Sequence, residues 1–137
     1  MHRREEPIPS HHQPQDLAAR GRDWTAAWNS HDLERVLALY AETAEMSSDR
    51  IPAFGFDPSG TLRGKDRLRA YWSKALGLVP DLHFTLVDVF VSPDSAVVVY
   101  QNQRGNRICE YLRFDADGLI VQGSANHPVH ESVEHRR

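Results

Sequence analysis

The sequence has only one cysteine, Cys109, and no apolar run that approaches the roughly 20 residues needed to cross a bilayer. An intramolecular disulfide is therefore excluded, and we expect no membrane-spanning segment. Walker loops and the patterns GxGxxG, GxSxG and HExxH are also absent. The formal net charge is -3, with acids and bases interspersed, so no basic stripe is present to follow a nucleic-acid backbone. We expect neither a membrane nor a nucleic acid as partner.

A length of 137 residues is typical of one domain, and both ends of this chain are polar. Residues 1–15 are rich in proline, histidine and charge, and residues 129–137 are rich in histidine and charge, so we expect two disordered tails around a domain at 16–128. The first stretch has no apolar core and is not a secretory signal, which favours a cytoplasmic protein. Five of the eight histidines lie in these tails at spacings that match no metal-ligand pattern, so we expect no metal site.

Three helices are predicted in the first half of the domain. Leu17, Gly21, Trp24 and Trp28 recur at helical spacing, and Asp16 could cap the start of their helix. The segments 29–42 and 64–78 carry similar apolar stripes.

The segment between the second and third helices is predicted to be mostly irregular. Residues 44–48 alternate like a short strand, but the loop at 49–60 contains two prolines and two glycines. This loop also carries Phe54 and Phe56, which a purely solvated loop would not need. We expect both rings to pack over the domain as a lid or rim.

From residue 82 the apolar period changes to two. Four strands are predicted at about 82–91, 95–103, 107–115 and 119–127, separated by the turn signals SPDS, RGN and DADG. Long twisted strands in such an antiparallel meander tend to curl. We therefore predict an α+β fold, a conical barrel in which a strongly curved antiparallel sheet wraps around three N-terminal helices. The open end of such a cone is a natural ligand pocket.

The stretch ICEYLRF, residues 108–114, places a glutamate, Glu110, in an otherwise apolar strand face. We expect this face to point inward, because the opposite face would bury Arg113. An enclosed carboxylate loses hydration, so its pKa rises unless a cation or several donors compensate. Glu110 then becomes a neutral hydrogen-bond donor or a base that titrates near neutral pH. A structural pairing with a histidine or arginine, or a place at a wet rim, is the alternative.

The last strand is predicted to turn its more apolar series inward: Leu119, Val121, Gly123, Ala125 and His127. Small side chains at Gly123 and Ala125 would leave space beside Glu110, as a pocket wall requires. His127 would face the same space, or would be a half-exposed residue at a strand end.

These observations define a set of candidate site residues. The catalytic candidates are Glu110, His127 and Asp49, although Asp49 could instead be a simple turn former. Aromatic residues could line the pocket for a flat apolar ligand, or could belong to the core. The expected pocket-lining residues are Trp24, Trp28, Tyr40, Ser48, Phe54, Phe56, Tyr71, Trp72, Leu112, Gly123 and Ala125.

Several stretches resemble the SnoaL-like branch of the nuclear transport factor two-like superfamily. They are DWTAAWNSHDLERVLALYAETAEMSSD, LRGKDRLRAYWSKAL, PDLHFTLVDVF and FDADGLIVQGSANHP. The resemblance covers about residues 16–128. It implies a conical α+β barrel with a pocket at the wide end, and a homodimer formed through the outer face of the sheet.

The resemblance also assigns roles by position. The hydrogen-bonding acid of the superfamily's steroid isomerases falls on Glu110. Their catalytic base falls on Ser48, or on Asp49 after a shift of one residue, and their oxyanion tyrosine falls on Trp24.

Two classes of function follow from these assignments. One is a cofactor-independent enzyme of the isomerase or cyclase type, in which Glu110 and His127 move a proton on a small hydrophobic carbonyl compound. The other is a non-catalytic module of the same fold that binds a small apolar molecule or acts as a dimeric interaction protein.

Overall fold

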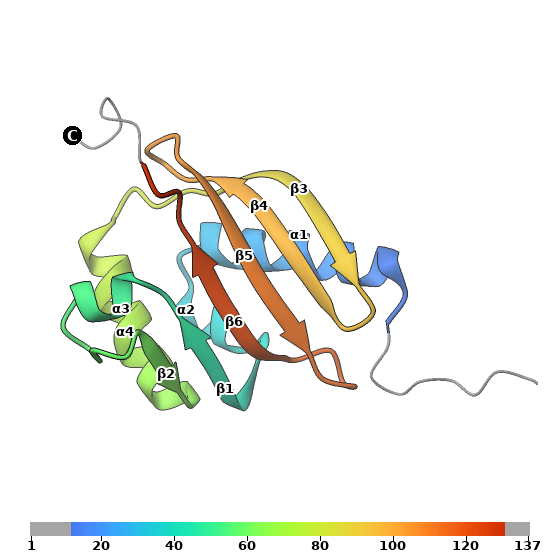
Figure 1. Cartoon of the computed structure of the whole chain (residues 1–137), viewed down its shortest axis with the longest axis horizontal. Helices are drawn as coiled ribbons and strands as arrows, with labels where there is room; N and C mark the ends of the chain where they lie inside the picture. The colour runs from blue at the N-terminus through green and yellow to red at the C-terminus, as the bar shows by residue number, and fades with distance from the viewer. Residues whose placement is uncertain (1–11, 131–137) are drawn as a thin grey trace, which may run out of the picture.

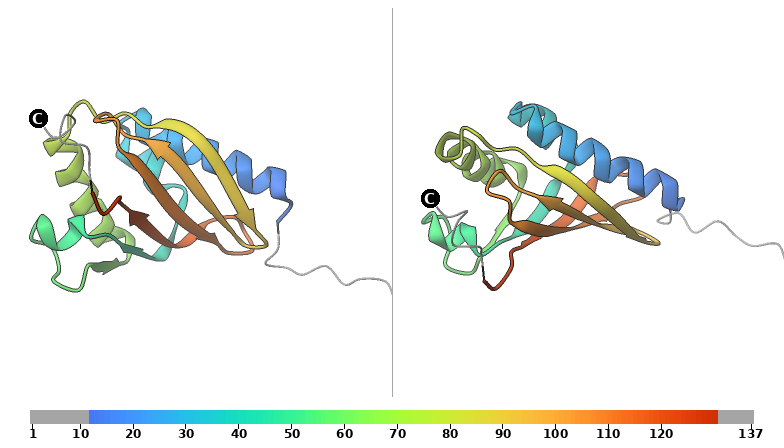
Figure 2. Two further views of the ribbon diagram at one scale, coloured as in Figure 1. Left: turned by 45° about the horizontal axis from the view of Figure 1, so that its top comes forward. Right: turned by 90° about the horizontal axis from the view of Figure 1, so that it is seen from above.

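A six-stranded sheet with helices on one face forms the domain (Figure 1). The computed structural model describes residues 12–130. The helices are α1 (Pro14–Asn29), α2 (Leu33–Leu37), α3 (Arg50–Ala53) and α4 (Lys65–Leu78). The strands are β1 (Tyr40–Ser47), β2 (Thr61–Arg63), β3 (Thr85–Ser92), β4 (Ser95–Gln101), β5 (Arg107–Phe114) and β6 (Ile120–Asn126). Figure 2 shows α1 and α4 on the same side of the curved sheet. The predicted α+β class and the cone-like curvature are confirmed.

The strand order is β2-β1-β6-β5-β4-β3. Strands β3 to β6 form the predicted antiparallel meander. Strand β1 joins this meander as a parallel neighbour of β6, and β2 closes the edge as an antiparallel partner of β1. The sheet does not close on itself, so the end near α3 and α4 stays open.

Helix α1 buries the predicted face, with Leu17, Gly21, Trp24 and Trp28 all enclosed. Its start differs from the prediction, because Asp16 lies in the first turn and does not cap the helix. The helix begins at Pro14, whose fixed backbone angle suits a first helical position. It therefore starts inside the segment expected to be a tail. Residues 1–11 and 131–137 lie outside the described part of the chain.

The second helix is shorter than predicted, and its apolar stripe continues into a strand. Asp32 caps α2 by accepting a hydrogen bond from the backbone N–H of Arg35. The helix ends at Leu37, and β1 begins at Tyr40. The Ile120 N–H donates to the Leu39 carbonyl, so pairing with β6 takes over where the helix stops.

The loop at 49–60 contains more regular structure than expected. A short helix, α3, precedes Phe54, and β2 follows the loop. Phe54 and Phe56 both pack against Tyr71 of α4, with ring centroids 6.0 and 5.4 Å apart. The loop therefore lies against α4 as a rim. Within residues 12–130, no helix has the length and hydrophobicity required to cross a membrane.

One irregularity in β6 changes which residues enter the core. Phe114 pairs with Ile120, whereas Leu112 pairs with Gly123, so the register shifts between these pairs. As a result Ile120 is buried, and the predicted inward residues Leu119 and Val121 are only half-buried. The register that follows the bulge carries Gly123, Ala125 and His127 toward the concave side.

Candidate functional site

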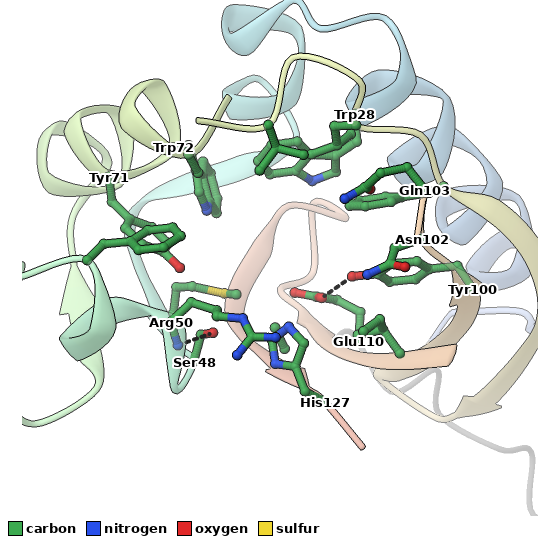
Figure 3. Close-up of a pocket in the computed structure, with 18 of the residues that line it drawn as sticks. Trp28, Ser48, Arg50, Tyr71, Trp72, Tyr100, Asn102, Gln103, Glu110 and His127 are labelled. Carbon is green, nitrogen blue, oxygen red and sulfur yellow. Dashed lines mark hydrogen bonds between the residues drawn. The ribbon is translucent and has the colours of Figure 1, made fainter. Parts of the chain in front are cut away.

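A cavity of about 480 Å³ lies between the concave face of the sheet and the helices, at the open end of the cone (Figure 3). Its wall includes aromatic residues from helices and strands, namely Trp24, Trp28, Tyr71, Trp72, Phe84 and Tyr100. Its polar residues are Ser48, Arg50, Asn102, Gln103, Arg104, Glu110 and His127.

The aromatic part of the wall is a connected set of rings. Trp28 meets Trp72 edge to face at 5.2 Å, and Phe84 lies 4.1 Å from Tyr100 between ring centroids. Trp24 stacks on Phe84 at 5.7 Å. Such packing restricts the rings, so the cavity presents a rigid apolar surface suited to a flat or alicyclic ligand.

Glu110 of β5 is the acidic group on the cavity wall, and only 2% of its surface is exposed. The Tyr100 hydroxyl donates a hydrogen bond of 3.4 Å to its Oε1 atom (Figure 3). Burial raises the pKa of Glu110 to about 8, and the hydrogen bond from Tyr100 opposes this shift. The carboxyl group is therefore mostly protonated at neutral pH and can donate a hydrogen bond to a ligand.

His127 follows β6 and contributes to the cavity wall, with 15% of its side chain exposed. Its Nδ1 atom lies 3.0 Å from Oδ1 of Asp49, an ion-pair distance when the imidazole is protonated. The histidine thus connects the cavity to a carboxylate outside it.

Asp49 itself does not lie on the cavity wall. Its side chain is 64% exposed and borders a shallower depression on the other side of His127. The residue precedes α3, and the turn into this helix directs the carboxylate outward. The expectation of a second carboxylate inside the pocket is therefore wrong, although Asp49 contacts a residue that is inside.

Ser48, on which the resemblance places the isomerase base, lies on the cavity wall. Its Oγ atom accepts a hydrogen bond of 3.1 Å from the backbone N–H of Arg50. Burial raises the pKa of Tyr71, and a hydrogen bond with Ser48 opposes that effect. The hydroxyl groups of Ser48 and Tyr71 therefore form a small cluster on the cavity wall.

Seven of the expected pocket-lining residues lie on the wall: Trp24, Trp28, Ser48, Phe54, Tyr71, Trp72 and Ala125. Four do not. Tyr40 lies behind the wall, where its hydroxyl accepts a hydrogen bond of 3.0 Å from Nε1 of Trp24. Phe56 packs on Tyr71, with Lys74 over its ring, and is not part of the wall.

The other two residues that were wrongly placed at the wall belong to the core. Leu112 has no exposed surface. Gly123 is buried and does not line the cavity, because the Leu112 side chain and Sδ of Met46 lie beside it, each 3.5 Å from the place where a Cβ atom would be.

Several wall residues were not among the expected pocket-lining residues, among them Phe84, Arg50, Tyr100 and the turn 102–104. The place of Tyr100 could have been predicted from the RGN turn signal, because this turn sets the register between β4 and β5. In that register Tyr100 pairs with Ile108, and Ile108 lies two positions before Glu110 on the same face of β5. Arg50 had no comparable signal, since its place depends on the fold of α3. Among residues 12–130, no group of three or more histidine, cysteine or acidic side chains could hold a metal ion.

The chain is similar to proteins of a known family. The model of the SnoaL-like domain matches residues 21–123. A SnoaL-like protein of unknown function from Burkholderia thailandensis is 36% identical, with a TM-score of 0.81 over 86% of this chain and 98% of that one. No curated protein matches the chain significantly.

Two more distant structures share the fold. A proposed polyketide cyclase from Sinorhizobium meliloti is 15% identical, with a TM-score of 0.66 over 84% of this chain and all of that one (100%). A proposed isomerase of the SnoaL-like family from Agrobacterium tumefaciens is also 15% identical, with a TM-score of 0.66 over 83% and 98% of the two chains. The family match and the 36% identical relative lead to one conclusion: the chain belongs to the SnoaL-like family.

Proposed function

We propose that the protein is a cofactor-independent proton-transfer enzyme of the isomerase or cyclase type that acts on a small hydrophobic carbonyl compound. The observation that carries this proposal is the buried Glu110 carboxyl group on the wall of an aromatic cavity. A buried group of this kind costs stability, and a ligand that accepts its proton in a hydrogen bond offsets part of that cost.

Glu110 acts as the hydrogen-bond donor to the carbonyl oxygen of the substrate. A neutral carboxyl group in a water-poor site stabilises the enolate that forms when the neighbouring C–H bond breaks. The Tyr100 hydroxyl holds the carboxyl group through its bond to Oε1. The rigid aromatic wall holds the apolar body of the substrate against this pair.

His127 acts as the base. The α C–H bond breaks, its proton passes to the imidazole, and its electron pair forms the C=C bond of the enolate. Asp49, 3.0 Å from Nδ1, stabilises the resulting imidazolium. If the substrate carries a C=C bond at the β,γ position, return of the proton to the γ carbon of the dienolate gives isomerisation. Attack of the enolate carbon on a second carbonyl group, whose oxygen then takes up the proton, gives ring closure. The names of the S. meliloti and A. tumefaciens proteins fit both outcomes.

Deuterium exchange tests this proposal without knowledge of the natural substrate. The protein is incubated with trans-1-decalone in D2O, and incorporation at the α carbons is followed by NMR. We expect exchange above the buffer rate, because proton abstraction is the shared first step. General acid–base groups typically contribute factors of 10² to 10⁴, so Glu110→Gln and His127→Gln should each lower the enzymatic rate at least ~100-fold.

Binding of the same ketone separates the two classes of function. If wild-type protein binds 1-decalone but catalyses no exchange, the enzymatic proposal fails and a non-catalytic binding module is favoured. If Glu110→Gln binds the ketone and has lost exchange, the role assigned to Glu110 is supported. An unchanged exchange rate in both variants would remove these residues from the mechanism.

A further inference from the structure

The cavity has a second polar region, which faces Glu110 from the helical side. Figure 3 shows the indole nitrogens of Trp28 and Trp72 directed into the cavity, across from Glu110. Trp28 comes from α1 and Trp72 from α4, and both line the cavity. An indole nitrogen can only donate a hydrogen bond.

The Trp28 nitrogen is buried and has no hydrogen-bond acceptor within residues 12–130. The side chain as a whole is 94% enclosed, with 6% of its surface exposed. Buried donors are rarely left without an acceptor, because the lost hydration is not recovered. By contrast, the neighbouring Trp24 nitrogen donates to the Tyr40 hydroxyl at 3.0 Å. Of these two tryptophans, Trp28 is the one whose buried donor has no acceptor within residues 12–130.

The rest of the wall is also richer in donors than in acceptors. Arg50 and Arg104 line the cavity, and a guanidinium group has no acceptor atom. The acidic residue of the wall is Glu110, and burial raises its pKa to about 8, so its carboxyl group is mostly uncharged at neutral pH. The charged groups that line the cavity therefore favour an acceptor-rich molecule and disfavour an amine or other cation.

We propose that the cavity takes a carbocyclic compound with two acceptor oxygens, one held by Glu110 and the other by the indole N–H of Trp28. This inference rests on the proposed function, because the first oxygen is the carbonyl that Glu110 polarises. The second oxygen orients the ring so that the carbon next to that carbonyl group approaches His127. Dicarbonyl compounds and acidic enols have this arrangement of acceptors.

Two matched ketones test the second acceptor. trans-Decalin-1,5-dione and trans-1-decalone have the same carbon skeleton and differ in one carbonyl oxygen. All three tryptophans of the chain, Trp24, Trp28 and Trp72, line the cavity, so intrinsic fluorescence reports directly on its occupation. Both ketones absorb only weakly at the tryptophan excitation wavelength, so a parallel titration of free tryptophan corrects for absorption and quenching by the ketone. One additional hydrogen bond in a buried site should make the dione bind about 5- to 10-fold more tightly to wild-type protein.

Two variants locate the second acceptor. Trp28→Phe removes an N–H group that has no partner and keeps an aromatic ring, so we expect a folded protein that binds both ketones with nearly equal affinity. Trp24→Phe is the matched control, because the N–H group of Trp24 already donates a hydrogen bond to the Tyr40 hydroxyl. This variant should be less stable and should retain the preference for the dione. Thermal unfolding of each variant verifies the fold before the titrations.

The outcomes distinguish this inference from the proposed function. Equal affinities for the two ketones in wild-type protein, or an unchanged preference in Trp28→Phe, would overturn the second acceptor. A dione preference that depends on Trp28, in a protein that exchanges no deuterium into 1-decalone, would support the inference and reject the enzymatic proposal. Exchange together with the expected preference supports both.

Discussion

Glu110 links the stability of the protein to pH. Its pKa rises from 4.5 to about 8 on folding, so the folded state holds one more proton than the unfolded state between these values. The free energy of unfolding should therefore fall as the pH rises through this range, by at most about 1.4 kcal/mol per pH unit. Below pH 4.5 both states are protonated, and above about 8 the contribution levels off.

Glu110→Gln isolates this contribution, because glutamine keeps the shape of the side chain and does not titrate, although its amide is a weaker hydrogen-bond donor than a neutral carboxyl group. We expect urea denaturation at pH 5, 6, 7 and 8 to show a variant that gains stability relative to wild type at each step. Parallel stability curves for the two proteins would show that Glu110 ionises normally in the fold.

Tyr100 sets how far the pKa of Glu110 rises. Its hydroxyl donates to the carboxyl group and lowers the pKa of Glu110, against the effect of burial. Tyr100→Phe removes that donor with little change in volume, so the pKa of Glu110 should move further upward. The ¹³C chemical shift of the Glu110 carboxyl carbon, followed against pH, measures this change directly. A titration at the wild-type midpoint would contradict the assigned hydrogen bond.

At the scale of elements, the close approach of α1 to the sheet positions the tryptophan wall. Gly21 makes this approach possible, since a Cβ atom there would lie 3.1 to 3.2 Å from side-chain atoms of Val89 and Val98. Gly21→Leu should lift the helix from β3 and β4 and destabilise the protein by about 1–3 kcal/mol. It should also weaken binding of 1-decalone, because Trp24 and Trp28 move with the helix.

Gly77 of α4 provides the control for this prediction. Nothing lies within 4 Å of the place where its Cβ atom would be. Gly77→Ala should therefore follow helix propensity alone and stabilise the protein by up to about 1 kcal/mol. Chemical denaturation of both variants measures the two effects. Equal responses at the two positions would show that helix propensity, and not packing against the sheet, dominates at Gly21.

The same scale explains which features could be predicted from the sequence. The inward position of Glu110 depends on alternation within one strand, which is local, and it was predicted. The positions of Tyr40 and Asp49 depend on where β1 begins and ends, and this is set by its parallel pairing with β6, about 80 residues away. The short repeat of apolar residues before Tyr40 fits a helix or a strand equally well. The pairing of β1 with β6 selects the strand from Tyr40 onward.

At the scale of the whole molecule, the outer face of the sheet carries exposed apolar residues. Helices α1 and α4 lie on the concave side, and no helix within residues 12–130 covers the opposite one (Figure 2). Since Glu110 points inward, the next residue, Tyr111, points outward. Tyr111 pairs with Val97, and Val97 pairs with Phe90, so an apolar row crosses β5, β4 and β3 on the uncovered face. Phe90 is 60% exposed.

We propose that this row is the centre of a homodimer interface, with a second copy of the chain as its occupant. A sheet face open to water usually carries polar residues, and exposed apolar patches commonly mark protein interfaces. A two-fold axis through the row would place the same residues of both copies together. Analytical ultracentrifugation of wild-type protein should therefore give twice the chain mass at micromolar concentration.

Phe90→Glu tests this arrangement, because two buried carboxylates near a two-fold axis would repel each other without a cation to compensate. We expect a monomer that remains folded, since Phe90 contributes to the outer face and not to the core. Leu78→Glu is the matched control: Leu78 is a large apolar residue of α4 with 57% exposure, and it lies away from the outer face. A monomeric wild-type protein, or a Phe90→Glu variant that stays dimeric, would exclude the row as the interface.

Glu110 and Tyr111 are neighbours on β5 whose side chains point to opposite faces of the sheet. Dissociation of the dimer should therefore also loosen the strand that holds the Glu110 carboxyl group. The monomer should exchange deuterium into 1-decalone more slowly than the dimer.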